Sequence, residues 1–324
     1  MVDSVFSKKY DALVIDSVNF AYRTFKMKEE TPLRISKKSV YKNSICNFID
    51  AVESLKNKYL KSDGQIYLLF DNYFSRSDLR STFMFADRKK LSESYKANRK
   101  KESKEFYNSL NFLRYYYLIG PAEYHTIRVD NLEADDLVKP LFMKLNVFKG
   151  NTTALMVTTD MDWTRYLCPN SDWLPDLAGV PETCDEFADK MGFKVTESNI
   201  ILYKSIFGDE SDNISALVRK NEKSFNEFKE LLNEISYPEE LIIISRDKEE
   251  AKRNSILERI SLNEQDLLVN LQLVSPIPCG VDLISCSMTT GRNADTLYHT
   301  VRNAIGLDVS KEFVFGNVRR NRVS

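Results

Sequence analysis

The sequence is poor in cysteine, glycine, proline and histidine for its 324 residues. Its five cysteines include no C-x-x-C pair, which disfavours a disulfide or zinc framework. With only 10 glycines and 9 prolines, long flexible linkers are not expected. No apolar stretch approaches the length of a membrane span, and residues 1–10 lack a signal-peptide core. We therefore expect an intracellular protein that does not enter a membrane.

An excess of charge of one sign is also lacking, since 46 basic and 47 acidic residues give a net charge of −1. This balance at first argues against a nucleic-acid partner. Local distribution matters more than the total, however, because a cluster of acidic residues neutralised by metal would leave the rest of the chain basic. The apolar fraction of 43% is ordinary for a globular protein and too high for a disordered one.

Three short apolar runs each lead to an aspartate. Residues 12–15 are followed by Asp16, residues 66–70 by Asp71, and residues 154–157 by two threonines and Asp160. Runs of this length and composition are typical of buried strands in a parallel sheet. Ligands of such sheets bind at the carboxyl ends of the strands. The sequence therefore predicts several carboxylates at one edge of the sheet, where only a cation would make their proximity favourable.

More acidic residues accompany these three. Glu133 and Asp136 lie three apart on one face of a predicted helix, and Asp162 would share a side with Asp160 if that segment stays extended. The candidate ligands are Asp16, Asp71, Glu133, Asp135, Asp136, Asp160, Asp162, Asp209 and Asp212. A set with oxygen ligands alone favours Mg²⁺, with Mn²⁺ as a substitute, over zinc. Two such ions about 4 Å apart would suit phosphoryl transfer.

A strongly basic segment follows the second predicted strand. Between residues 88 and 104 only two acidic residues accompany eight basic ones: Arg88, Lys89, Lys90, Lys96, Arg99, Lys100, Lys101 and Lys104. Aromatic residues crowd both of its sides, among them Phe83, Phe85 and Tyr95 and then Phe106, Tyr116 and Tyr117. Cations interleaved with aromatic rings suit a nucleic-acid single strand. The alternative is a solvated basic helix resting on aromatic core residues.

The order of predicted elements is that of an α/β protein with a mostly parallel central sheet flanked by helices. A helical pattern between residues 45 and 55 separates the first two strands, as a doubly wound sheet requires. Residues 200–275 are predicted to be mainly helical, with Gly208 ending the first helix, and residues 294–305 form one more helix. We place a nuclease-like α/β domain at residues 1–199, with a basic helical insertion at about 72–117. A helical C-terminal region then covers 200–324.

These residues resemble the structure-specific 5′-nucleases, a family that includes flap endonucleases and the 5′-nuclease domain of bacterial polymerase I. The matching motifs occur in family order over residues 12–213. They are Val14-Ile15-Asp16-x-x-Asn19, Phe70-Asp71, Tyr95-Lys96-Ala97-Asn98-Arg99, Glu133-Ala134-Asp135-Asp136, Thr159-Asp160-Met161-Asp162 and Gly208-Asp209-x-x-Asp212-Asn213. Within the family the chain is most similar to the phage ribonuclease H branch, whose members remove RNA primers and 5′-flap DNA during replication. The resemblance implies a PIN-like fold with a basic helical arch.

The resemblance also implies roles for individual residues. Asp16, Asp71, Glu133 and Asp135 would surround one Mg²⁺, and Asp160, Asp162 and Asp209 a second, with Asp136 and Asp212 close by. Lys96 and Arg99 match the pair that reaches the scissile phosphate and would be catalytic. Further contacts to nucleic acid are expected from Arg23, Arg88, Lys89, Lys90, Tyr95, Lys100, Lys101, Arg219 and Lys220.

The chain departs from the family pattern after Asn213. Family members commonly continue with a glycine-rich hairpin that grips duplex DNA, whereas residues 214–221 contain no glycine. Arg219 and Lys220 would contact the backbone in its place. The expected substrate is a DNA or RNA–DNA duplex with a 5′ end or flap, and the expected state is a monomer in the cytoplasm of an infected bacterium. A single-stranded DNA-binding protein or a sliding clamp is a candidate partner, the clamp through Phe313 and Phe315.

Alternative interpretations compete with this one. Aspartate often terminates strands and caps helices, which explains any single acid but not nine in family order. A PIN-like ribonuclease shares an acidic sheet edge, yet it needs neither the basic insertion nor the helical C-terminal region. A catalytically inactive junction-binding relative should have lost acidic residues, and here the set is complete.

Overall fold

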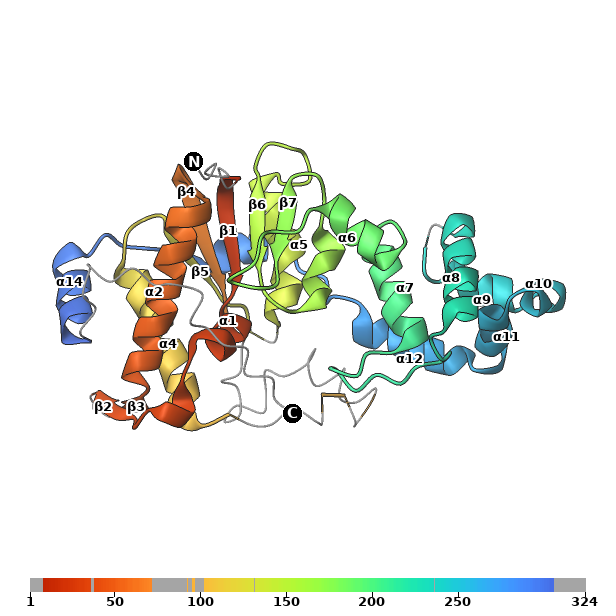
Figure 1. The fold of residues 1–324 in the computed structure, drawn as a ribbon, viewed down its shortest axis with the longest axis horizontal. Helices are drawn as coiled ribbons and strands as arrows, with labels where there is room; N and C mark the ends of the chain where they lie inside the picture. The colour runs from red at the N-terminus through yellow and green to blue at the C-terminus, as the bar shows by residue number, and fades with distance from the viewer. Residues whose placement is uncertain are drawn as a thin grey trace, which may run out of the picture.

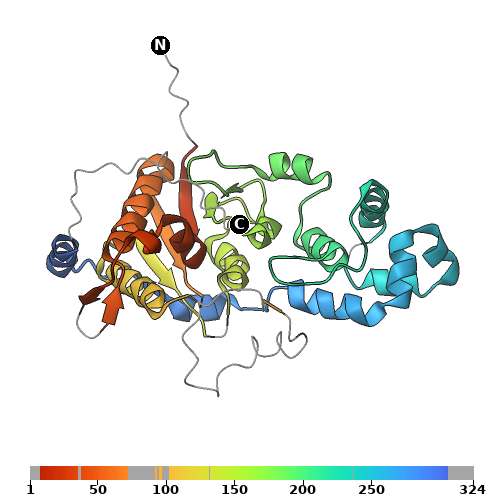
Figure 2. The same cartoon turned by 60° about the horizontal axis from the view of Figure 1, so that its bottom comes forward.

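The computed structural model describes residues 8–35, 38–71, 92, 95–96, 102–130, 132–235 and 237–305. The molecule is elongated, with a helix-covered sheet in one part and a group of helices extending from it (Figure 1). In Figure 2 the dark blue C-terminal helix lies at one end of the molecule and the teal helices at the other. None of the described helices is both long enough and apolar enough to span a bilayer.

The central sheet has six strands in the order β7-β6-β1-β4-β5-β8, and all neighbours are parallel except β5 and β8. The bounds are β1 Tyr10–Asp16, β4 Leu60–Leu69, β5 Tyr124–Ile127, β6 Ala154–Val157, β7 Ser171–Leu174 and β8 Met288–Thr290. The three predicted strands, β1, β4 and β6, are confirmed. The other three contain no long apolar run, so their sequences gave no comparable signal. Strand order reverses between β1 and β6, which is where ligands of open α/β sheets bind.

One face of the sheet is covered by helices α1 (Ser17–Thr24), α2 (Lys42–Tyr59), α4 (Lys104–Ile119) and α14 (Asp295–Ala304). Strand β1 alternates between two cores, so that Leu13 and Ile15 pack on this side while Ala12 and Val14 pack on the other. A short hairpin of β2 (Leu33–Ile35) and β3 (Lys38–Val40) precedes α2, after the 3₁₀ turn η1 (Met27–Glu29).

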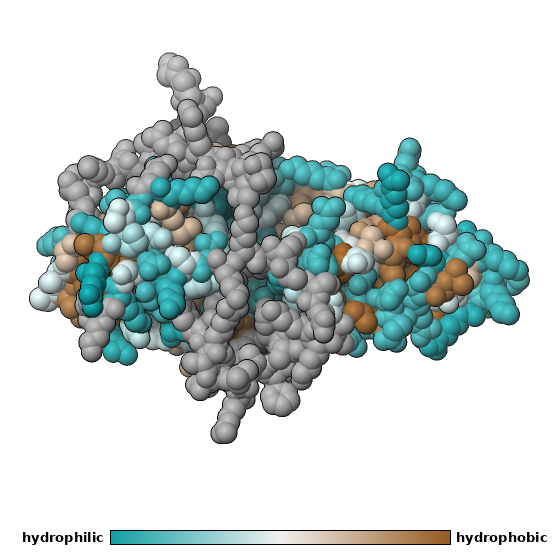
Figure 3. Space-filling view, turned by 90° about the horizontal axis from the view of Figure 1, so that it is seen from below, coloured by the Kyte–Doolittle hydropathy of each residue, from teal (hydrophilic) through white to brown (hydrophobic). Residues whose placement is uncertain are grey.

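The opposite face carries α5 (Ala134–Leu145), the 3₁₀ helix η2 (Met161–Tyr166) and α7 (Glu197–Phe207), which share a continuous core with the helical end. The helical end consists of α8 Glu222–Glu234, α9 Glu240–Ser245, α10 Lys248–Arg253, α11 Ser255–Leu262 and α12 Glu264–Val274. Along the chain, α6 (Cys184–Met191) lies between β7 and α7, and α13 (Val281–Ser287) lies between α12 and β8. In the view from below, apolar side chains gather on the surface of the helical end (Figure 3).

The insertion predicted at about residues 72–117 extends too far toward the C-terminus. Residues 104–119 form α4, which follows β4 and precedes β5 as a crossover helix of the α/β core. Phe106, Tyr116 and Tyr117 are almost completely buried in that core. The alternative reading of these aromatic residues as core was therefore right, because a ring enclosed by apolar neighbours cannot stack on a base. The rest of the predicted insertion, residues 72–103, lies almost entirely outside the described residues and stays a prediction.

The last described residues of the C-terminal region pack against the α/β part of the molecule. β8 pairs antiparallel with β5 at the edge of the sheet, and α14 packs on α4, where the Tyr116 hydroxyl donates to the Tyr298 hydroxyl at 2.9 Å. Residues 288–305 thus return to the α/β part after the helical end. The division of the chain at residue 199 stays a prediction.

Candidate metal centre

Asp16 lies at the carboxyl end of β1 and caps α1. Its Oδ1 accepts a hydrogen bond from the Asn19 backbone N–H at 3.0 Å, and its Oδ2 accepts from the Thr158 hydroxyl at 3.1 Å. Burial raises the pKa of Asp16 well above its ordinary value, and the neighbouring carboxylates of Asp71 and Asp160 raise it further. The carboxylates at the ends of β1, β4 and β6 therefore act on one another, as the strand pattern predicted.

Asp160 follows β6 on the other side of the point where strand order reverses. Burial raises the pKa of Asp160 to about 7, with Asp162 and Asp135 as the next contributors. The segment is not extended, since Asp160 caps η2 and its Oδ1 accepts from the Asp162 backbone N–H at 2.9 Å. The condition on which Asp162 was predicted to face the same side as Asp160 is thus not met. The turn nevertheless keeps the two carboxylates close enough to interact.

Asp71 and Glu133 meet at the start of α5. Asp71 Oδ1 accepts from the Ala134 backbone N–H at 2.5 Å, and Glu133 caps the helix. Lys96 donates to both carboxylate oxygens of Glu133, at 2.7 and 2.8 Å, and its Nζ lies 3.6 Å from Asp212 Oδ2. The lysine thus links Glu133 of the predicted first group to Asp212, which was predicted to lie close to the two ions.

Asp162, Asp209 and Asp212 form the tightest acidic group. One carboxylate oxygen from each lies within 4.8 Å of the others. Gly208 positions this group. Its φ is +78°, and a Cβ at this position would lie 2.7 Å from Ala216 N, so the turn has no room for a side chain. The turn after α7 brings Asp209 back beside η2, and Gly208 ends α7 as predicted.

Two buried cations at this group were not predicted. Lys204 Nζ contacts Asp162 and lies 2.7 Å from Asp209 Oδ2, and Arg165 Nη2 lies 2.7 Å from Asp162 Oδ1. Burial alone would raise the pKa of Asp162, but Arg165 and Lys204 hold it below its usual range. Lys204 similarly lowers the pKa of Asp209 against the effect of burial. The available signal was a lysine within the mostly apolar segment Ile200–Phe207 of a helix.

Asp136 differs from the other predicted ligands. It is 1% exposed, and its Oδ2 accepts from the Glu133 backbone N–H at 3.1 Å as part of a capping box. Its Oδ1 accepts from the Ile277 backbone N–H at 2.7 Å. Both oxygens are engaged by backbone donors, so the structure favours an anchoring role for Asp136 over ligation of a metal.

The remaining eight acids fit divalent cations. All offer carboxylate oxygen, and burial and neighbouring carboxylates raise the pKa values of Asp16 and Asp160, an effect that a bound cation would relieve. No His or Cys takes part among the described residues of this site. The donor set therefore suits a hard cation such as Mg²⁺ or Mn²⁺.

The predicted nucleic-acid contacts have different outcomes. The prediction that Tyr95 contacts nucleic acid is wrong, because the residue is 1% exposed and its hydroxyl donates to Asp212 Oδ2 at 3.4 Å. Arg219 and Lys220 are exposed, and Lys220 donates to the Tyr203 hydroxyl at 2.7 Å. Arg23 is mostly buried near Asp16, and burial lowers its pKa to about 10. The predictions that fall outside the described residues concern Arg88, Lys89, Lys90, Arg99, Lys100, Lys101, Phe313 and Phe315.

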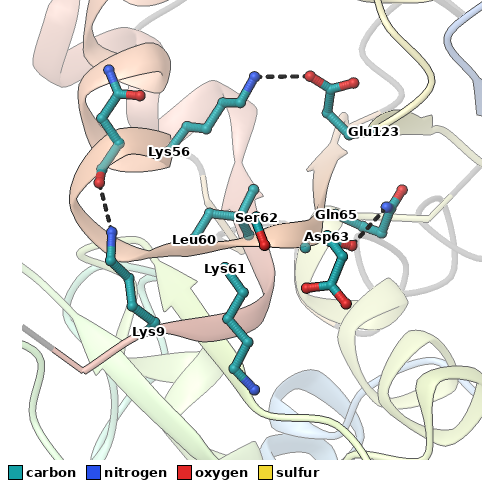
Figure 4. A pocket seen from close by; sticks show the side chains of 10 residues that line it. Lys9, Lys56, Leu60, Lys61, Ser62, Asp63, Gln65 and Glu123 are labelled. Carbon is teal, nitrogen blue, oxygen red and sulfur yellow. Dashed lines mark hydrogen bonds and ion pairs between the residues drawn. The ribbon is translucent and has the colours of Figure 1, made fainter.

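A cavity lies at the opposite edge of the sheet. Its volume is about 760 Å³, and its lining residues precede or begin β1, β4 and β5 (Figure 4). Lys56 forms an ion pair with Glu123 at 2.8 Å, Lys61 one with Asp11 at 2.7 Å, and Lys9 donates to the Asn57 carbonyl at 2.6 Å. The lysine head groups are engaged, and no group of carboxylates gathers there. The acidic edge remains the candidate site.

Comparison with known proteins agrees with this geometry. Residues 11–192 match the family model described as "5'-3' exonuclease, N-terminal resolvase-like domain". The chain is 26% identical over 292 residues to DNA polymerase I of Lactococcus lactis subsp. lactis (strain IL1403), covering 88% of this chain and 31% of that protein. A second match, to DNA polymerase I of the subspecies cremoris (strain MG1363), is 27% identical over 217 residues, covering 65% of this chain and 23% of that protein. The chain thus spans about a third or less of the length of these relatives.

Solved structures share the fold. A crystal structure of a bacteriophage T5 flap endonuclease in complex with DNA and metal ions is similar with a TM-score of 0.58 and 17% identity, covering 91% of this chain and 98% of that one. A T5 5′-exonuclease with bound zinc is similar with a TM-score of 0.56 and 18% identity, covering 92% and 99%. At these identities the likeness shows the fold: a mostly parallel sheet flanked by helices, with a helical region beside it.

Proposed function

Because this chain belongs to the 5′-3′ exonuclease family, we propose that it is a divalent-metal-dependent 5′-nuclease that hydrolyses phosphodiester bonds near 5′ ends and flaps. One observation carries the proposal: carboxylates from β1, β6, α5 and the turn after α7 meet at one edge of the sheet, and a lysine lies among them. The substrate would be DNA or an RNA–DNA duplex, including an RNA primer at a 5′ end, in replication.

Two groups of acids would hold Mg²⁺. Asp16, Asp71, Glu133 and Asp135 would bind one ion, while Asp160, Asp162, Asp209 and Asp212 would bind another. When bound, such ions lower the pKa of an attacking water and stabilise the leaving 3′-oxygen. Asp16 and Asp160 support this assignment most strongly, since their raised pKa values mark carboxylates held together without enough neutralising charge.

The cationic side chains would act on the phosphate. Lys96 interacts with Glu133 and Asp212, so a divalent cation on those carboxylates would free its ammonium group to stabilise negative charge developing on the scissile phosphate. Arg23 lies near Asp16, and its Nη1 is buried with no hydrogen-bond partner among the described residues. A buried unpaired guanidinium donor beside the acidic edge suits a phosphate oxygen. Arg99 would complete this set.

The test is a panel of 5′-labelled substrates incubated with Mg²⁺: a 5′-flap DNA, a blunt duplex and an RNA–DNA hybrid. We expect short labelled products that carry 5′-phosphate and 3′-hydroxyl ends, and we expect no cleavage by the Asp160→Asn variant. Internal cleavage of single-stranded RNA without dependence on a 5′ end would instead support a PIN-like ribonuclease. Binding of the same duplexes without any cleavage would support an inactive relative.

A further inference from the structure

Basic side chains also lie at the carboxyl ends of the parallel strands. Strand β5 is followed directly by Arg128, two residues before Asp130. A second arginine, Arg114 of α4, also reaches this corner, and both line a small recess with Asn111 and Asp71. The edge of the sheet therefore carries two guanidinium groups next to one of the proposed metal ligands.

The recess has an apolar base and a polar opening. Val18, Phe70 and Leu110 line it and are all buried, whereas Asn111, Arg114 and Arg128 are partly exposed. Its volume of about 10 Å³ is close to the space that a single water molecule needs. One oxygen of a larger anion fits this space, while the rest of that anion would stay at the opening.

The two arginines act on each other unfavourably. Burial lowers the pKa of Arg128, and the positive charge of Arg114 lowers it further, while Asp130 opposes both effects. Among the described residues, Arg114 has no hydrogen-bond or ion-pair partner. Asp71 offers negative charge, but its carboxylate is also a proposed ligand of the first metal ion. Binding of a divalent cation to Asp71 would leave the recess with an excess of positive charge.

From this geometry we propose that Arg114 and Arg128, with Asn111, form a phosphate subsite for a nucleic-acid strand. The subsite binds a backbone phosphate that neighbours the one at the acidic edge, and it gains affinity when Asp71 coordinates a divalent cation. Planar guanidinium groups suit this task, because each can donate two parallel hydrogen bonds to a phosphate. The inference rests on the proposed nuclease function but concerns strand binding, which can be measured without cleavage.

The experiment measures binding of a 5′-flap DNA by fluorescence anisotropy in Ca²⁺, used here as a divalent cation probe, and in EDTA. Wild type is compared with Arg114→Ala, with Arg114→Lys, and with Arg253→Ala on α10 as a control at the far helical end. We expect Arg114→Ala to raise the dissociation constant on the order of tenfold in Ca²⁺. The effect should be smaller in EDTA, and the slope of log K against log salt should fall by about 1. Arg114→Lys should fall between wild type and Arg114→Ala, and Arg253→Ala should resemble wild type.

A scan with single methylphosphonates locates the phosphate. At the contacted position the neutral linkage should weaken binding by wild type but not weaken binding by Arg114→Ala any further. The proposal is overturned if the affinity lost through the methylphosphonate and the affinity lost through Arg114→Ala add at every position. It is also overturned if Arg253→Ala loses as much affinity as Arg114→Ala while circular dichroism shows that both proteins are folded. Failure of wild type to cleave in Mg²⁺ would instead count against the nuclease function, since these binding results do not depend on cleavage.

Discussion

Lys96 and Glu133 form a direct ion pair in which the ammonium group donates to both carboxylate oxygens, at 2.7 and 2.8 Å. The side chains of both residues are largely shielded from solvent, with exposed fractions of 10% and 12%. The lysine thus neutralises a carboxylate that we assign to the first metal ion. A metal ion at the proposed site would compete with the lysine for Glu133, and this competition would link metal binding to release of the lysine.

Replacing Lys96 by methionine should therefore have opposite effects on two measurements. The apparent affinity for Mg²⁺ should rise, because Glu133 loses its competing cation. The rate of single-turnover cleavage of a 5′-flap should fall on the order of 10²-fold, because the positive charge aimed at the phosphate is gone. Isothermal titration and rapid-quench kinetics measure the two quantities.

Lys61→Met provides the control, since Lys61 pairs with Asp11 at the opposite edge of the sheet. It should change neither the Mg²⁺ affinity nor the rate. If Lys96→Met alters only KM, the residue binds substrate and does not act in the transition state.

Adjacent residues Asp135 and Asp136 should separate catalysis from stability. Asp135→Ala should abolish cleavage and leave the Tm in EDTA unchanged or higher, because its charge adds to the repulsion that Asp160 experiences. Asp136→Ala should destabilise the protein by about 3 kcal/mol, because two backbone N–H groups lose a buried carboxylate acceptor. Thermal unfolding measures the stability of both variants, and Mg²⁺-dependent cleavage measures their activity. An Asp136→Ala protein as stable as wild type would refute the anchoring role.

Metal affinity should depend on pH through Asp160. Its pKa in the metal-free protein is raised to about 7, so below pH 7 a cation must displace a proton from this carboxyl group. The apparent Mg²⁺ affinity should increase as pH rises from 6 toward 7 and level off above that value. Titrations in buffers with different ionisation enthalpies should detect the released proton. Asp160→Asn should bind more weakly with a flatter profile, and an equally steep profile in this variant would exclude Asp160 as the titrating group.

Lys204 should stabilise the metal-free protein. It is 7% exposed and contacts Asp162 and Asp209, so Lys204→Met leaves two largely buried carboxylates with less compensating charge. We expect a loss of about 3 kcal/mol in EDTA, and Mg²⁺ should raise the Tm of the variant more than that of wild type. Differential scanning calorimetry with and without Mg²⁺ measures both effects. Equal responses to Mg²⁺ would show that Lys204 and the cation do not compete for these acids.

The acidic edge could be predicted because parallel strands place their carboxyl ends together, so Asp16, Asp71 and Asp160 needed no knowledge of loops. The anchoring contacts of Asp136 could not be predicted, because helical spacing says which face a residue occupies but not which distant backbone N–H approaches it, here that of Ile277. The burial of Tyr95 could not be predicted for the same reason. Its place in a basic segment suggested contact with solvent, whereas tertiary packing encloses it.

The strands β5, β7 and β8 escaped prediction because each is short and contains polar residues that pair with distant partners. In β5, the His125 ring contacts Thr290 of β8 at 3.0 Å and stacks on Tyr67. Such pairing depends on the return of residues 288–305 to the sheet, which no local pattern encodes. Lys204 was overlooked because a lysine within a helix is usually exposed, and only the turn at Gly208 brings Asp209 beside it.

The Mg²⁺ dependence of 5′-flap hydrolysis tests the central claim most directly. Purified protein should be mixed with a 5′-labelled flap in EDTA, and cleavage should then be followed over time as Mg²⁺ is added in increasing amounts. We predict no product in EDTA and a rate that rises with Mg²⁺ until both groups of carboxylates are occupied. An intact flap at saturating Mg²⁺, or an equal rate in EDTA, would contradict the claim that these carboxylates bind cations for phosphodiester hydrolysis.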